Sequence, residues 1–171
     1  MSPELVEHRL AVEREEVHHF DEVFVGPGAD AQSQMGSLID MGNRDRVSRL
    51  IEQAGDEGEI VLKGAPLSDA AFLTPTLFRI DDVTSPLVQE ELFGPIVSIE
   101  TFADEQEAVA KANATAYGLA ASVFTADHHR ALRIARAIRA GTVWINSHLK
   151  LFAEAETGGY GKSGLGRLHG P

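Results

Sequence analysis

Apolar residues recur in two stretches of the chain at intervals of three and four positions, the spacing that places side chains on one face of a helix. One stripe begins after Arg44 and ends at Gly55, and its members are Val47, Leu50, Ile51 and Ala54. A second stripe follows Asp127, a residue suited to cap a helix, and ends at Gly141. Its members are Ala131, Ile134, Ala135 and Ile138. Both segments are predicted to be amphipathic helices.

Short apolar runs between these stripes and after the second one predict buried strands. Two further runs contain or follow proline, which disfavours the helical conformation in the residue before it, and are therefore expected to be extended. The five predicted strands cover residues 60–62, 72–78, 96–102, 121–125 and 142–146. Strands that alternate with helices need crossover connections, which favour parallel pairing. The pattern thus predicts the α/β class, with a mostly parallel open sheet and flanking helices.

The remaining segments carry weaker patterns. Either Asp104 or Thr101 can cap one more helix, whose inner side would carry Ala108, Val109 and Ala112. Residues 4–16 are charged and carry irregularly spaced apolar residues, and a helix is expected there. Because the spacing is irregular, the N-terminal segment 1–22 is left unassigned. Residues 23–171 are interpreted as one domain or a part of one.

Composition narrows the function classes. The chain has 171 residues with 26 acidic and 15 basic side chains, a net charge of −11 that would repel a nucleic acid backbone. It has no apolar run of the roughly 18 residues that cross a bilayer, and its first residues lack the pattern of a secretory signal. We therefore expect a cytoplasmic protein with neither nucleic acid nor membrane as a partner.

The absence of cysteine excludes several kinds of chemistry. With no cysteine in the sequence, the chain forms no disulfide, thiolate metal site or thiol nucleophile of its own. The pairs His18–His19 and His128–His129 are adjacent in sequence, so their side chains point apart and are not expected to chelate a metal. Gly161-Lys162-Ser163 is similar to part of a phosphate-binding loop, but Glu156 stands where that loop needs glycine. No metal site is predicted.

Four segments resemble the aldehyde dehydrogenase superfamily in their residues, order and spacing. They are QEELFGPI at 89–96, ANATAYGLA at 112–120, AGTVWIN at 140–146 and GGYGKSGLGR at 158–167. Weaker agreement occurs at Met35-Gly36 and over Thr74-Pro75-Thr76. The resemblance covers residues from about Gly26 to Gly170, which is most of the chain.

The resemblance implies an NAD- or NADP-dependent oxidation of an aldehyde to a carboxylic acid. In this family a cysteine thiolate attacks the aldehyde, hydride passes to the nicotinamide, and a glutamate activates water to hydrolyse the thioester. The cysteine, that glutamate and the dinucleotide-binding sheet lie upstream of the matched segments. The chain is therefore interpreted as a partial catalytic domain with no catalytic residue of its own, inactive alone and a weak cofactor binder. The alternative is a non-catalytic interaction or assembly module that retains the fold.

The same resemblance assigns site residues. Glu91 would accept hydrogen bonds from the nicotinamide ribose, and Phe93 would pack beside the nicotinamide ring. The alternative is that Glu91 caps a turn and Phe93 belongs to the core. Asn146 would help to organise the active-site region without touching the reacting atoms, or would merely end its strand. Lys162 is shifted by one position from the lysine of the family motif, and only a local change in the loop is expected.

The loop 147–157 corresponds to the family's variable substrate loop. Leu151, Phe152 and Thr157 are the candidate wall residues, and Thr157 stands where many relatives have an aromatic residue. Glu154 and Glu156 would favour a cationic aldehyde, unless both are solvated loop charges. Members of the family continue past the last glycine-rich run with a strand that joins a neighbouring subunit, so oligomerisation is in doubt for a sequence that ends at Pro171.

Overall fold

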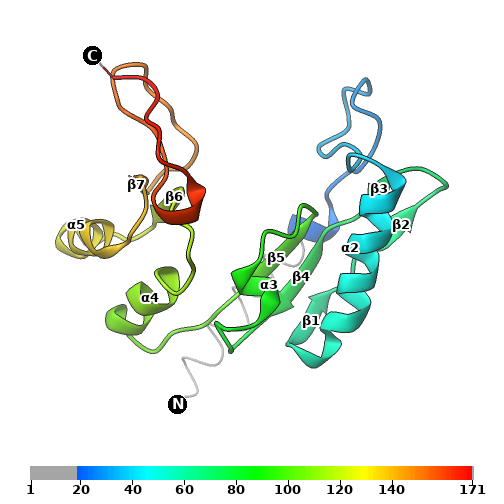
Figure 1. Cartoon of the computed structure of the whole chain (residues 1–171), viewed down its shortest axis with the longest axis horizontal. Helices are drawn as coiled ribbons and strands as arrows, with labels where there is room; N and C mark the ends of the chain where they lie inside the picture. The colour runs from blue at the N-terminus through cyan, green and yellow to red at the C-terminus, as the bar shows by residue number, and fades with distance from the viewer. Residues whose placement is uncertain (1–18, 171) are drawn as a thin grey trace. The chain divides into compact units, whose positions relative to one another are not determined.

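Helices alternate with short strands along residues 19–170, the part of the chain that the computed structural model describes (Figure 1). The chain divides into two compact units, Met1–Glu100 and Thr101–Pro171. The α/β class is confirmed. The helix predicted over residues 4–16 lies outside the described residues, as does His18.

The first predicted stripe forms helix α2 (Met41–Gln53), followed by the short 3-10 helix η1 (Ala54–Asp56). Val47 and Ile51 are buried, with exposed fractions of 0% and 2%, so the stripe faces the core as expected. The helix begins three positions earlier than the apolar pattern indicated, because the Asp40 carboxylate accepts a hydrogen bond from the Asn43 N–H at 2.7 Å.

A three-stranded sheet in the order β1-β4-β5 carries the core of the first unit. Strand β1 (Glu59–Leu62) pairs antiparallel with β4 (Thr76–Arg79), and β4 pairs parallel with β5 (Ile96–Ile99). Phe78 and Ile80 are fully buried beside α2, in one cluster with Val47 and Ile51. Strand β5 ends at Ile99, so the prediction that it extends to residue 102 was wrong.

The predicted strand 72–78 is divided at Thr74-Pro75. Its first part, β3 (Phe72–Leu73), pairs antiparallel with β2 (Pro66–Leu67), a strand that the sequence did not reveal. The Thr74 hydroxyl accepts a hydrogen bond from the Ala65 N–H at 2.8 Å and so replaces a ladder bond at the break. Beyond β4, Ser85 caps the single turn α3 (Pro86–Gln89), with Pro86 at its first position.

The second unit pairs β6 (Ala120–Val123) with β7 (Thr142–Ile145) in parallel, with α4 (Glu105–Ala112) and α5 (His128–Ala137) beside them (Figure 1). Of the two candidate caps for α4, Asp104 is the one used: it accepts from the Glu107 N–H at 2.9 Å. Asp127 caps α5 as predicted, although the helix ends at Ala137 because Ile138 is extended. The glycine-rich tail forms one 3-10 turn, η2 (Gly161–Ser163).

Among residues 19–170 no helix is both long and apolar enough to span a bilayer. Within the same residues, no three histidine, aspartate or glutamate side chains gather as a metal ion would require.

Candidate functional site

The turn between α3 and β5 carries the two predicted cofactor-binding residues. Glu90 ends α3 in an extended conformation, and Glu91 follows with an exposed side chain. Leu92 then packs against the buried cluster under α2, while the Phe93 side chain is 66% exposed. The turn therefore anchors itself through Leu92 and presents Glu91 and Phe93 outward. The alternative that Phe93 is a core residue is wrong for the described chain.

The backbone of this turn is held by two side chains of α2. The Asn43 amide donates to the Phe93 carbonyl at 2.9 Å, and the Arg46 guanidinium donates to the Leu92 carbonyl. Arg46 also donates twice to the Asn43 side-chain oxygen, at 3.1 and 2.8 Å. Neither residue belongs to the matched motifs, and sequence reasoning missed both.

Gly94 and Pro95 complete the turn against α2 and β4. A side chain at Gly94 would place its first carbon 2.7 Å from a methyl group of the buried Val47, which explains why glycine stands there. The Pro95 carbonyl accepts a hydrogen bond from the Thr76 N–H at 2.8 Å, where β4 begins. Phe93, Gly94 and Pro95 border a hollow of about 370 Å³ that Met35, Gly36 and Leu38 also line. The weakly matched Met35-Gly36 segment thus lies beside the turn.

Three of the motif segments meet in the second unit. The Gly118 carbonyl accepts from the Gly141 N–H at 3.0 Å and from the Tyr160 N–H at 2.9 Å. The Gly118 N–H in turn donates to the Ser163 hydroxyl at 3.0 Å. A side chain at Gly141 would collide with the Gly158 carbonyl. These contacts require small residues, so they give the motif glycines a packing role.

Asn146 stands directly after β7 with a positive φ of 50°, a conformation that asparagine adopts more readily than most residues. Its side-chain oxygen accepts from the Thr125 N–H at 2.9 Å, and its amide donates to the Thr125 carbonyl at 3.0 Å. The side chain therefore substitutes for one more residue of the ladder between β6 and β7. This geometry suits a residue that ends its strand, and it also orients the loop that follows.

The candidate substrate loop exposes its apolar residues. Leu151 and Phe152 have exposed fractions of 63% and 58%. Thr157 is the last residue of the loop and pairs with Leu168 through two backbone hydrogen bonds of 2.8 Å. The side chains of Glu154 and Glu156 are both exposed. Leu151 and Phe152 are thus free to line a pocket, whereas the backbone of Thr157 is committed to the tail.

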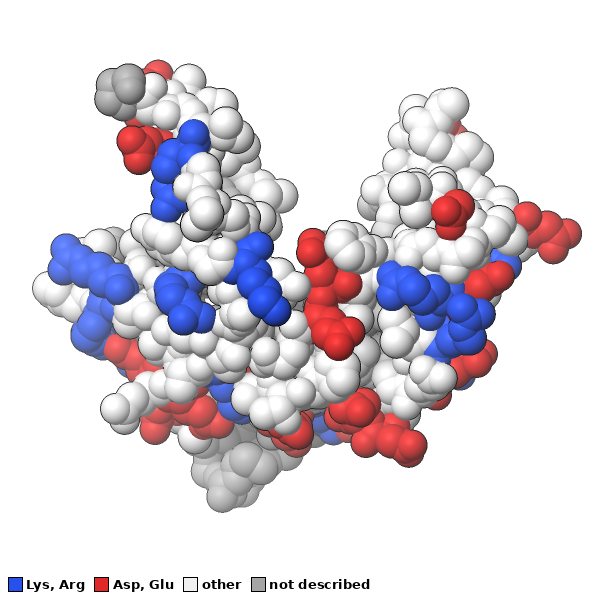
Figure 2. All heavy atoms as spheres, viewed as in Figure 1, with Lys and Arg blue, Asp and Glu red and all other residues white. Residues whose placement is uncertain are grey.

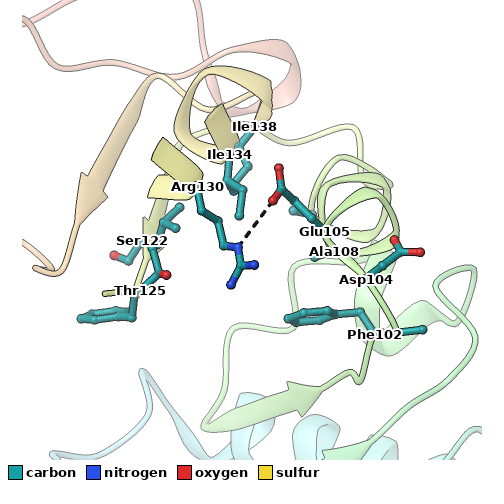
Figure 3. A pocket seen from close by; sticks show the side chains of 13 residues that line it. Phe102, Asp104, Glu105, Ala108, Ser122, Thr125, Arg130, Ile134 and Ile138 are labelled. Carbon is teal, nitrogen blue, oxygen red and sulfur yellow. Dashed lines mark ion pairs between the residues drawn. The ribbon is translucent and has the colours of Figure 1, made fainter. Parts of the chain in front are cut away.

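The second unit has a pocket of about 520 Å³ that the sequence did not reveal (Figure 3). Ile134 and Ile138, two members of the predicted apolar stripe, line it together with Phe102 and Phe124. Figure 3 shows Arg130 of α5 reaching toward Glu105 of α4. The Arg130 Nε atom lies 3.6 Å from a carboxylate oxygen of Glu105.

Glu105 joins the two helices of this unit. Its carboxylate accepts two hydrogen bonds of 2.7 Å from Arg133 of α5, and these hold the pKa of Glu105 below its usual value. The same contacts raise the pKa of Arg133. Figure 2 shows that basic and acidic side chains are both exposed in this view, although the chain as a whole has a net charge of −11.

Comparison with known proteins identifies the family. The sequence profile of the "Aldehyde dehydrogenase family" matches residues 9–171. The chain belongs to this family. The match begins upstream of the motifs quoted above, and the resemblance seen in those motifs is confirmed.

Within the family, betaine aldehyde dehydrogenases are among the similar proteins. The chain is 40% identical over 154 residues to the enzyme of Brucella anthropi, covering 85% of the chain and 31% of that protein. It is 42% identical over 154 residues to that of Cereibacter sphaeroides, covering 88% and 32%. The chain thus spans about a third of the length of these curated relatives.

Solved structures give the same result. A betaine aldehyde dehydrogenase of Staphylococcus aureus in complex with NAD⁺ is 38% identical, with a TM-score of 0.85 over 92% of this chain and 33% of that one. An aldehyde dehydrogenase of Bacillus cereus is 35% identical, with a TM-score of 0.88 over 96% and 34%.

Proposed function

We propose that this chain supplies the nicotinamide end of the cofactor site of an NAD- or NADP-dependent aldehyde dehydrogenase, an oxidoreductase that converts an aldehyde to a carboxylic acid. The observation that carries the proposal is the turn at residues 90–95, which anchors Leu92 in the core and exposes Glu91 and Phe93 together. The NAD⁺ complex of the similar Staphylococcus aureus enzyme supports a dinucleotide as the ligand. Further parts of this proposal are a cytoplasmic location and the absence of nucleic acid and membrane partners.

The chemistry of the two side chains suits a nucleoside. An ionised carboxylate accepts hydrogen bonds at two oxygens, so Glu91 can take both neighbouring hydroxyls of a ribose. An exposed phenylalanine ring offers an apolar surface on which a planar ring packs. In the second unit, Asn146 and the loop 147–157 are proposed to serve the aldehyde in the intact enzyme, with Leu151, Phe152 and Thr157 as wall residues.

A cationic aldehyde is the proposed substrate class. The similar curated proteins are named betaine aldehyde dehydrogenases, and betaine aldehyde carries a quaternary ammonium group. Glu154 and Glu156 are exposed in the loop that carries Phe152. Carboxylates attract a cation, and an aromatic face adds a cation–π contact. The proposal therefore places the positive end of the substrate against this loop.

The chain alone is proposed to be inactive toward aldehydes. It contains no cysteine, so it has no thiolate to form the thioester on which the family's reaction depends. Purified chain, NAD⁺ or NADP⁺ and an aldehyde should produce no reduced cofactor above the protein-free rate. Aldehyde-dependent reduction of either cofactor would contradict this part of the proposal.

The cofactor contact is tested by NMR titration of the chain with millimolar NAD⁺. Amide signals of residues 90–95 should shift on addition, and Glu91→Gln or Phe93→Ala should weaken the apparent affinity about tenfold, the effect of losing one good contact. Glu90→Gln and Phe124→Ala serve as matched controls and should leave the titration unchanged. Shifts that avoid residues 90–95 would overturn the assignment.

A further inference from the structure

We propose that Asn43 and Arg46 of α2 are positioning residues for the cofactor, which fix the backbone on which Glu91 and Phe93 stand. This inference rests on the proposed cofactor role of those two side chains. Asn43 and Arg46 precede the residues that they hold by 50 and 46 positions, and their side chains hydrogen-bond to each other and to the backbone of the turn. Their effect on the cofactor passes through the turn.

The contacts form one connected set with only one arrangement of the amide. Arginine can only donate, so the atom of Asn43 that faces Arg46 is its oxygen. The amide nitrogen must then point to the Phe93 carbonyl, 2.9 Å away. Arg46 thus holds the Leu92 carbonyl directly and the Phe93 carbonyl through Asn43.

The residue between these two contacts has a strained backbone. Phe93 has a φ of 51°, in the left-handed region that a bulky residue rarely adopts. Such a conformation persists only where its surroundings impose it, and it often occurs at ligand sites. The carbonyls on either side of the strained torsions accept the two α2 hydrogen bonds, and Gly94 packs on Val47 immediately afterwards. The contacts therefore impose the conformation that points the Phe93 ring outward.

The support is itself rigid. Asn43 and Arg46 are three positions apart on α2, so they lie one above the other on the same face. Asp40 caps that end of the helix, and Val47 and Ile51 fix it to the core with almost no exposure. A site residue is held more precisely by a packed helix than by its own loop.

If Asn43 and Arg46 only stabilised the fold, their variants would lose NAD⁺ affinity only as far as they lose stability. Asn43→Asp distinguishes this structural role from the positioning role. Aspartate keeps the oxygen that accepts from Arg46 but loses the N–H₂ that donates to the Phe93 carbonyl. Residue 43 lies in the first turn of α2, where a negative charge favours the helix, so the stability of the fold should not fall. The variant therefore keeps the contact with Arg46 and replaces the donor to the Phe93 carbonyl with an acceptor, which repels that carbonyl.

The experiment compares four variants of the whole chain: Asn43→Asp, Arg46→Ala, Arg46→Lys and, as control, Arg49→Ala on the exposed side of α2. The measurements are the Phe93 backbone coupling constant that reports φ, the apparent affinity for NAD⁺ by NMR titration, and thermal stability. We expect Asn43→Asp and Arg46→Ala to shift the Phe93 coupling and weaken NAD⁺ binding about tenfold. Arg46→Lys should recover part of the loss, and Arg49→Ala should change nothing.

The outcomes distinguish this inference from the proposed function beneath it. If the unaltered chain shows no NAD⁺-induced shifts at residues 90–95, the cofactor role fails and the positioning role with it. If those shifts occur but Asn43→Asp and Arg46→Ala bind NAD⁺ as well as the unaltered chain, only the positioning role fails. If the affinity falls only in proportion to lost thermal stability, with an unchanged Phe93 coupling, the residues are structural and the inference is wrong.

Discussion

Single residues of the motifs are explained by contacts with parts of the chain that are distant in sequence. Gly94 is small because Val47 of α2 packs against it, and Gly141 is small because the Gly158 carbonyl lies over it. Phe93 is exposed because Asn43 holds its carbonyl and Leu92 occupies the core beside it. A family motif at this scale combines residues with exposed side chains and glycines that leave room for neighbouring atoms.

The glycine at 94 gives a prediction for stability. Gly94→Ala forces a methyl group against the buried Val47, and overpacking of this kind costs about 1–3 kcal/mol. Chemical unfolding should show that loss in the free energy of unfolding. Gly55→Ala is the matched control, because a side chain there meets nothing within 4 Å. Equal stability of the two variants would mean that the contact with Val47 does not constrain the turn.

At the scale of elements, local signals predicted the helices better than the strands. Asp127 and the stripe that follows it sufficed for α5, since a cap and a period of 3.6 residues are both local. The division of residues 72–78 was not predictable, because it depends on the Thr74 hydroxyl bonding to Ala65, nine positions away and directly before β2. The single turn α3 was missed although Ser85-Pro86 is a typical start, because four residues carry no apolar period.

The candidate site was predictable only in part, because some of its contacts join residues that are distant in sequence. Glu91 and Phe93 could be named because they stand in a recurring motif. Asn43 and Arg46 could not, because their link to that motif spans about 50 positions and exists only in the fold. Contacts between elements that are distant in sequence form only in the folded chain, so hydrophobic periodicity does not reveal them.

The pair of helices in the second unit gives a prediction for pH. The folded-state pKa of Glu105 lies below its usual value because of the hydrogen bonds from Arg133. A lowered pKa contributes stability that is complete above the ordinary glutamate value, about 4.3, and is lost as the pH falls through the folded value. Helical circular dichroism during thermal unfolding should therefore show a lower melting temperature for Glu105→Gln at pH 7.

That difference should shrink as the pH falls below the ordinary glutamate value and through the lowered folded-state pKa, because the unaltered carboxylate is then protonated as well. Glu107 and Asp127 also have lowered pKa values, so the unaltered chain loses stability in acid for several reasons. The comparison with Glu105→Gln isolates one of them, and Glu90→Gln serves as the control for removing a charge. A difference that stays constant with pH would exclude the ion pair as its cause.

At the scale of the whole molecule, apolar surface remains exposed in the described residues of both units. Phe24 and Phe93 are 48% and 66% exposed in the first unit, and Phe124 and Leu132 are 69% and 49% exposed in the second. The β6–β7 sheet has two strands, so each strand has one edge without a neighbouring strand in the described part. Open edges and apolar side chains favour association with another chain.

This surface predicts association that depends on concentration. The mass measured by light scattering should rise as the chain is concentrated, and Phe124→Ser should reduce the rise because it removes an exposed ring beside β6. Ala126→Ser, an exposed neighbour that changes little apolar area, is the control. A monomer at every concentration would argue against both this prediction and the alternative role as an assembly module.

The amide of Asn146 also affects how the protein ages. Asparagine is among the residues that degrade with heat, losing its amide nitrogen to become aspartate. At this position the lost nitrogen is the donor to the Thr125 carbonyl, so two acceptor oxygens would then face each other across 3.0 Å. The end of the β6–β7 pair would open in that fraction of molecules, and the loop 147–157 would lose its fixed starting point. Old or heated preparations should therefore lose order in this loop before the core of either unit unfolds.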